Sequence, residues 1–250
     1  MPHPASEHFK GKSIPEHIKE ARTKGAQASA EIHGTEISGH DAAFADSVRD
    51  TALVLALSSE LAFTFLPKDQ AGLLVLLLLA GWTLWKACRS ALLGWARLER
   101  LHRLIEEERW EIQHHRPQER EELMELYEAK GFEGELLTEV LDVLMADENR
   151  LLQVMLIEEL GLSLESYEHP LKQAFGAFLG AASVLTLGAL AFFFLPVNYL
   201  YYVAGALFLG AGLRTAKIEN IKLLPSLIWN LAVFTLTLGF VHFAGEFFRK

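Results

Sequence analysis

The chain has 250 residues, of which 51% are apolar and 22% charged, and its formal net charge is −9 at pH 7. So many apolar residues beside so many charges are unusual for a soluble domain and indicate that the two kinds occupy separate blocks. The sequence contains no glycine-rich phosphate loop, nucleophile arrangement or basic nucleic-acid surface, which argues against an enzyme, a prosthetic group and nucleic-acid binding.

Residues 1–44 form a polar N-terminal segment with five histidines. We expect a solvated or interfacial helix here, and a metal-collecting arm is the alternative. The residues available to such an arm are His8, His17, Glu31, His33, Glu36 and His40. Residues 1–40 lack an apolar core, so we expect no cleavable signal peptide.

Five apolar runs follow, two in residues 45–97 and three in residues 170–250. They are Thr51–Leu66, Ala71–Trp85, Ala174–Leu195, Val197–Leu213 and Leu223–Phe243. Runs of about 20 apolar residues match a hydrocarbon core about 30 Å thick, so we predict an all-α protein with five membrane helices. Glu60 inside the first run, and Lys86 and Arg89 after the second, are costly there unless they pair, reach the interface or line a wet cavity.

Basic residues indicate the orientation of these helices. Arginine and lysine are frequent before the first run, after the second and between the fourth and fifth, whereas the turns at Pro67–Gln70 and Pro196–Asn198 together hold one lysine. The positive-inside rule therefore places the N-terminus and residues 98–169 in the cytoplasm of a multi-pass membrane protein.

Residues 98–169 form an acidic insert between the second and third apolar runs. Between positions 99 and 168 it has 20 acidic and 7 basic residues, a net charge of −13. Apolar spacing and breakers predict three helical stretches: a continuation of the second membrane helix to about His115, a helix from Pro117 to about Lys130, and a last stretch or pair over 136–160.

Two pairs of glutamates in the insert have the spacing Glu-x-x-Glu, Glu108 with Glu111 and Glu119 with Glu122. Solvated surface pairing is the ordinary explanation of such charges. Residues three apart share a helix face, however, and a turn at Pro117 would fold the second pair onto the first. Converging carboxylates repel each other unless cations bind. Carboxylate oxygens together with the sulfur of Met155, further along the insert, suit Fe²⁺, Mn²⁺ or Zn²⁺ better than Ca²⁺ or Mg²⁺.

Two further motifs, Glu99-x-x-His102 and Glu111-x-x-His114, are typical of di-iron carboxylate bundles. Such bundles need the motif on two facing helices, whereas both copies here fall on one predicted helix. A ferroxidase is therefore only a lesser alternative.

Several segments together resemble the vacuolar iron transporter family of divalent-metal/proton antiporters. They are Val48–Asp50, Glu106–Ile112, Glu121–Gly131, Met145–Asp147 and Met155–Gly161. The resemblance implies a homodimer in a lipid bilayer, with five membrane helices per subunit and the second extended into a cytoplasmic three-helix metal-binding domain. By matching position it implies the metal ligands Glu108, Glu111, Glu119, Glu122, Met155 and Glu159, with Leu156 where some members have a second methionine.

The first two membrane helices depart from the family pattern. The family's first helix has an Asp-Gly near the position of Leu57, and no Asp-Gly stands there. We expect Glu60, with Cys88 and Asp50, to serve the pathway instead. The resulting hypotheses are proton-coupled export of Fe²⁺ or Mn²⁺ from the cytoplasm, or a membrane-anchored metal-binding or sensing protein that has lost transport.

Overall fold

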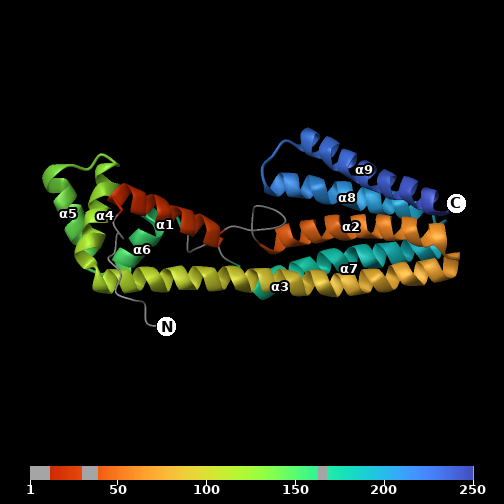
Figure 1. Ribbon diagram of the computed structural model, residues 1–250, viewed down its shortest axis with the longest axis horizontal. Helices are drawn as coiled ribbons and strands as arrows, with labels where there is room; N and C mark the ends of the chain where they lie inside the picture. Colours follow the sequence, from red (N-terminus) through yellow and green to blue (C-terminus); the bar gives the residue numbers. More distant parts are fainter. Residues whose placement is uncertain (1–11, 30–38, 163–167, 250) are drawn as a thin grey trace. The chain divides into compact units, whose positions relative to one another are not determined.

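The computed structural model describes residues 12–29, 39–162 and 168–249, and these residues form helices without any strand. The predicted all-helical class is therefore confirmed. In chain order the helices are α1 (Ile14–Ser29), α2 (His40–Phe65), α3 (Lys68–His114), α4 (Arg116–Glu128), α5 (Gly134–Met145), α6 (Glu148–Glu158), α7 (Pro170–Phe194), α8 (Tyr199–Ile218) and α9 (Leu223–Arg249), as labelled in Figure 1.

The helices form two compact units, and α3 belongs to both. The first, here called the acidic unit, contains α1, the part of α3 from Ala96 onward, and α4, α5 and α6. The second, here called the apolar unit, contains α2, α3 up to Trp95, and α7, α8 and α9. The N-terminal helix, which the sequence assigned to a separate polar segment, thus falls in the same unit as the acidic insert.

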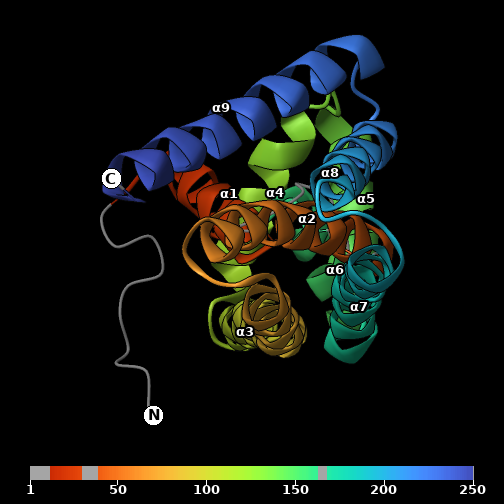
Figure 2. The same cartoon turned by 90° about the vertical axis from the view of Figure 1, so that its right-hand side faces the viewer.

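Helix α2 is the centre of the apolar unit and packs against α7, α8 and α9 (Figure 2). Glycines on α7 allow it to approach α2 closely. A Cβ atom at Gly176 would overlap the carbonyl oxygen of His40, and one at Gly180 would overlap that of Phe44. Small residues at helix contacts let backbones come together in this way, which strengthens packing where water supplies no driving force.

Prolines set the ends of α2 and α7. Leu66 precedes Pro67 with φ −124° and ψ 154°, and Leu195 precedes Pro196 with φ −121° and ψ 158°. The residue before a proline is disfavoured in the helical region, so both helices stop where the sequence predicted a turn.

Three helices, α3, α7 and α9, are long and apolar enough to cross a membrane. Many of their large apolar side chains are exposed, such as Leu236, Phe240 and Phe243 on α9. Helices α2 and α8 are also long, but neither contains an equally apolar stretch of sufficient length, and α2 carries Asp46, Arg49 and Asp50. Three of the five predicted spans are therefore supported, and the count of five stays a prediction.

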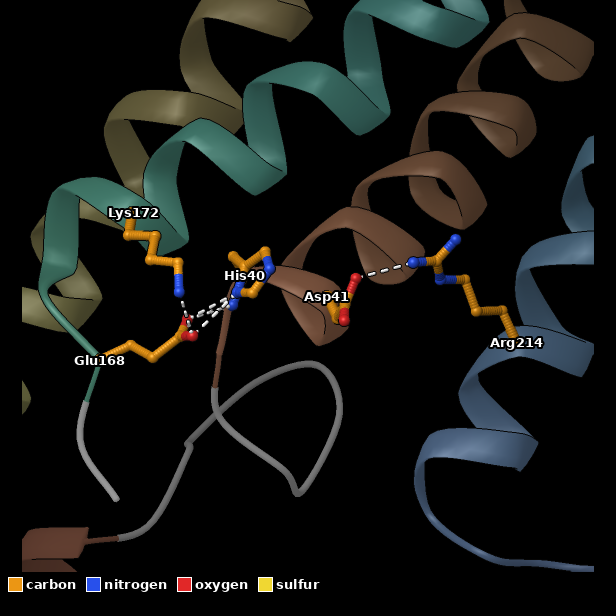
Figure 3. A network of polar contacts seen from close by, with 5 residues as sticks. All are labelled: His40, Asp41, Glu168, Lys172 and Arg214. Carbon is orange, nitrogen blue, oxygen red and sulfur yellow. Dashed lines mark hydrogen bonds and ion pairs between the residues drawn. The ribbon is translucent and has the colours of Figure 1, made fainter. Parts of the chain in front are cut away.

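A polar network joins the first turn of α2 to α7 and α8 (Figure 3). The Glu168 carboxylate accepts hydrogen bonds from the His40 backbone N–H and from Lys172 Nζ, both at 2.8 Å. Burial raises the pKa of Glu168, but these hydrogen bonds outweigh it and lower the pKa to about 2. Arg214 Nη2 on α8 lies 2.7 Å from Asp41 Oδ1. Charged contacts thus hold together the same end of three helices.

Candidate metal centre

The acidic unit brings predicted ligands from three helices together. Glu108 comes from α3, Glu119 from α4, and Glu159 from the C-cap of α6. The turn at His115 reverses the chain, because Pro117 suits the first turn of α4 and His115 N–H still bonds Glu111 O at 2.7 Å. Asp147 caps α6 by accepting a hydrogen bond from Arg150 N–H at 2.8 Å.

Buried apolar side chains lie on the same helices as these carboxylates. Ile112, Leu123 and Leu151 are fully buried, and Leu156 is 1% exposed. They recur at helical spacing on α3, α4 and α6, so each helix buries the face that also carries its glutamate. The acidic side chains are thereby fixed inside a small core, whereas an ordinary surface pair would face water.

Glu108, Glu119 and Glu159 converge closely. One carboxylate oxygen from each lies within 4.8 Å of the other two. The side chains are also deeply buried, since the exposed fractions of the three residues are 4%, 1% and 2%. Buried charges are normally paired or coordinate a metal, so this arrangement is typical of a cation site.

The same burial disturbs the acid–base behaviour of the cluster. Desolvation raises the pKa of Glu119 to about 11 and that of Glu122 to about 8, and repulsion from the neighbouring glutamates adds to it. Desolvation, followed by repulsion from the other carboxylates, raises the pKa of Glu108 and Glu159 well above the ordinary value. Without a cation the cluster therefore retains protons at neutral pH, and a bound cation would replace them.

His17 of α1 joins Glu122 and Glu159 in a second group of three potential ligand atoms within 4.8 Å of one another. Its Nε2 lies 3.7 Å from Glu122 Oε1 and 3.6 Å from Glu159 Oε1. The sequence-based ligand set omitted His17, which was expected on a solvated helix. The sequence did indicate that one face of α1 packs against the protein. This apolar face, at helical spacing, consists of Ile14, Ile18, Ala21, Gly25 and Ala28.

Two other predicted ligands lie beside these groups. Glu111 is half-buried, and its charge contributes to the raised pKa values of Glu108, Glu119, Glu122 and Glu159. Met155 is fully buried one turn before Glu159 on α6, next to Leu156. Glu111 belongs to neither group of three, and the role of all six predicted residues as ligands stays a prediction.

The three predicted pathway residues do not converge. Asp50 accepts a hydrogen bond from Lys86 Nζ at 2.9 Å. Glu60 lies ten residues further along α2, about 15 Å at 1.5 Å per residue, with Oε1 2.7 Å from His242 Nδ1 of α9. Cys88 is an exposed free thiol on α3. The expectation that Glu60 and Cys88 act together therefore lacks support from the geometry.

The other histidine candidates among the described residues belong to neither group of three. His102 and His114 are exposed, and His114 Nδ1 lies 2.8 Å from the Trp110 carbonyl oxygen. The di-iron motifs thus point neither histidine into the core of the acidic unit. Of the proposed N-terminal arm, His8, Glu31, His33 and Glu36 lie outside the described residues, and His40 belongs to the network of Figure 3.

Comparison with protein families gives a match to the VIT family over residues 96–246, which span the acidic insert and α7 to α9. Residues 45–95, which hold the atypical first two predicted membrane runs, fall outside the matched range. No curated protein matches the chain. The matched range contains all six predicted acidic-unit ligands and covers well over half of the chain, which therefore belongs to the VIT family, the vacuolar iron transporters.

Proposed function

We propose that this protein exports divalent transition-metal ions, Fe²⁺ or Mn²⁺, from the cytoplasm in exchange for protons, and that the acidic unit captures them. Membership of the VIT family supports a membrane transporter of metal ions and not an enzyme. The apolar helices α3, α7 and α9 support an integral membrane protein. The metal is the cargo in this proposal.

The convergence of Glu108, Glu119 and Glu159 is the observation that carries the proposal. Three buried carboxylates from three helices supply oxygen ligands at one point, and the buried thioether of Met155 lies on the same helix as Glu159. Such a set suits borderline divalent ions. We therefore propose Glu108, Glu111, Glu119, Glu122, Met155 and Glu159 as the ligands of the captured ion.

For the membrane pathway we propose Glu60 as the principal acidic group. Its side chain is 13% exposed, and it contacts His242 of α9 while the Tyr201 hydroxyl of α8 interacts with the same carboxylate. An ionisable residue within an apolar helix is a functional candidate by default, because it is costly to place there. We further propose a homodimer in the bilayer with its acidic unit in the cytoplasm, as the basic residues indicate.

A second function is favoured by Lys86. Its ammonium group, 4% exposed, lies between the carboxylates of Asp46 and Asp50, where it takes the place of a cation. With Cys88 exposed as well, the region expected to form the pathway around Asp50 has no open carboxylate–sulfur site. A membrane-anchored metal-binding or sensing protein without transport would have this arrangement.

Radiometal flux into proteoliposomes separates the two functions. We would compare ⁵⁴Mn²⁺ uptake under an imposed pH gradient for wild type, Glu60→Gln and a Glu108→Gln/Glu111→Gln double variant. Glu125→Gln, an exposed change on α4, is the matched control. Export predicts flux that the control retains and both test variants lose. Stoichiometric Mn²⁺ binding by wild type without flux would establish the anchored metal-binding protein instead.

A further inference from the structure

Helix α1 lies against the acidic cluster within the acidic unit, and its His17 side chain faces Glu122 and Glu159. We propose that α1 is a ligand-bearing cover of the metal centre and that the His17 imidazole is a nitrogen ligand of the captured ion. This inference rests on the proposed function, because it requires metal at the acidic cluster.

The spacing around His17 suits three atoms that share one ion. Its Nε2 lies 3.7 Å from Glu122 Oε1 and 3.6 Å from Glu159 Oε1, distances beyond the usual hydrogen-bond range. Two ligand atoms held about 2.1 Å from one tetrahedral ion are about 3.4 Å apart. The three atoms therefore need only small shifts to share a divalent ion.

Packing holds His17 in this place. Ile18, Ala21 and Ala28 of α1 are buried. A Cβ atom at Gly25 would overlap the carbonyl oxygen of Leu160, so α1 runs directly against the end of α6, which carries Glu159. Arg22, also on α1, donates a hydrogen bond from Nη2 to the Glu158 carbonyl oxygen at 3.1 Å. Helix α1 thus packs next to Glu159, the residue that belongs to both groups of ligand atoms.

An independent observation on α3 also points to a bound cation. Glu108 is 4% exposed, and within the described part of the chain its Oε1 atom is buried without a hydrogen-bond partner. An unsatisfied buried carboxylate oxygen is unfavourable unless a cation accepts its lone pairs. Because Glu108 converges on Glu159, and Glu159 on His17, one small region holds both the open oxygen and the imidazole.

The alternative explanation is that His17 only compensates the negative charge of the glutamates and does not bind the ion. Lys24 of α1 acts in that way, since its positive charge lowers the pKa of Glu108 and Glu159 against the larger effect of burial. A counter-charge and a ligand differ in one measurable respect, because only a ligand places its nitrogen on the metal. A nitrogen ligand would also shift the preference of the centre toward Mn²⁺, Fe²⁺ and Zn²⁺ and away from Mg²⁺ and Ca²⁺.

Pulsed electron paramagnetic resonance of the full-length protein with bound Mn²⁺ tests this directly. With ¹⁵N-labelled histidine, wild type should show a ¹⁵N hyperfine coupling that His17→Ala loses, and the Mn²⁺ dissociation constant should rise about tenfold or more, as when a supporting group of a metal site is lost. His102→Ala, an exposed change on α3 of the same unit, should keep both. Bound Mn²⁺ without nitrogen coupling in wild type, or coupling that persists in His17→Ala, would overturn the inference.

A second variant leaves the imidazole intact and disturbs only the cover. Gly25→Leu should push α1 away from Leu160 and weaken both the nitrogen coupling and Mn²⁺ affinity, whereas Gln27→Leu on the exposed face of α1 should not. Undiminished coupling in Gly25→Leu would contradict the role of α1 as a docked cover. Wild type that binds no Mn²⁺ at all would overturn the proposed capture function itself, and so the two failures are distinguishable.

Discussion

The Lys86 ammonium group donates a hydrogen bond to Asp50 Oδ2 at 2.9 Å, and this ion pair joins α3 to α2. Lys86 also reaches Asp46 Oδ2 at 3.1 Å, and Arg49 Nη2 lies 2.8 Å from Asp46 Oδ1. Two acids and two bases therefore neutralise one another on these helices, and a lysine that would be costly next to apolar segments becomes tolerable.

Replacing Lys86 with methionine should destabilise the protein. Losing one partner of a fully buried pair costs about 3–5 kcal/mol, and we expect about 1–3 kcal/mol here because Asp50 is 43% exposed and remains partly solvated. The measurement is thermal unfolding in detergent. Lys68→Met, at an exposed position in the first turn of α3, is the control. Equal melting temperatures for the two variants would show that the pair contributes nothing.

The metal-free protein should lose stability as the pH rises. The pKa values of Glu122, about 8, and Glu119, about 11, exceed the ordinary 4.5, so above pH 4.5 the folded state keeps protons that the unfolded state has lost. Stability then falls with increasing pH across this window. In the presence of a chelator, Tm should be lower at pH 8 than at pH 5. A Glu119→Gln/Glu122→Gln variant should show a smaller decrease of Tm with pH. A wild-type Tm that rises between pH 5 and pH 8 would contradict the expected sign.

Glu119→Gln should separate stability from metal binding. The pKa of Glu119 is about 11, so at pH 8 the metal-free protein must take up a proton on this side chain when it folds. The neutral amide removes that cost, so the metal-free Tm at pH 8 should increase while Mn²⁺ affinity falls about tenfold or more. Differential scanning fluorimetry with and without Mn²⁺ measures both effects. Glu125→Gln on the exposed face of α4 should change neither. Unaltered Mn²⁺ affinity in Glu119→Gln would remove this residue from the ligand set.

Gly180→Leu should separate α7 from α2. Even a Cβ atom at Gly180 would overlap the Phe44 carbonyl oxygen and lie 3.0 Å from Ser47 Cβ, so we expect about 1–3 kcal/mol of destabilisation from overpacking. Gly210→Leu on α8 is the matched control, because a Cβ atom there meets nothing within 4 Å. Comparable unfolding temperatures would indicate that α2 and α7 can move apart without cost.

The sequence alone predicted much of the acidic cluster, because its determinants are local. The spacing of Glu108 and Glu119 around a turn at Pro117 requires only helix geometry, and the structure brings those two carboxylates together. Glu159 joined the expected set through family resemblance, since its approach depends on the path of α6.

Contacts between distant segments were not predictable. His17 meets Glu159 across more than 140 residues of chain, and Glu60 meets His242 across 182, and no periodic pattern reports which helices become neighbours. Cys88 shows a different limit. Two residues along a helix turn by about 200°, so the burial of Lys86 toward α2 leaves Cys88 facing outward. Knowing which residue of α3 faces α2 would have shown that the thiol faces away from α2.

The deep burial of the four glutamates makes loading of the centre an acid–base reaction as well as a coordination reaction. Because desolvation holds protons on Glu119 and Glu122 near neutral pH, an ion that binds to their oxygens must displace those protons into the surrounding solvent. The heat of binding should then vary with the ionisation enthalpy of the buffer. Acidification of the compartment that the unit faces would empty the centre even when no ion gradient exists across the membrane.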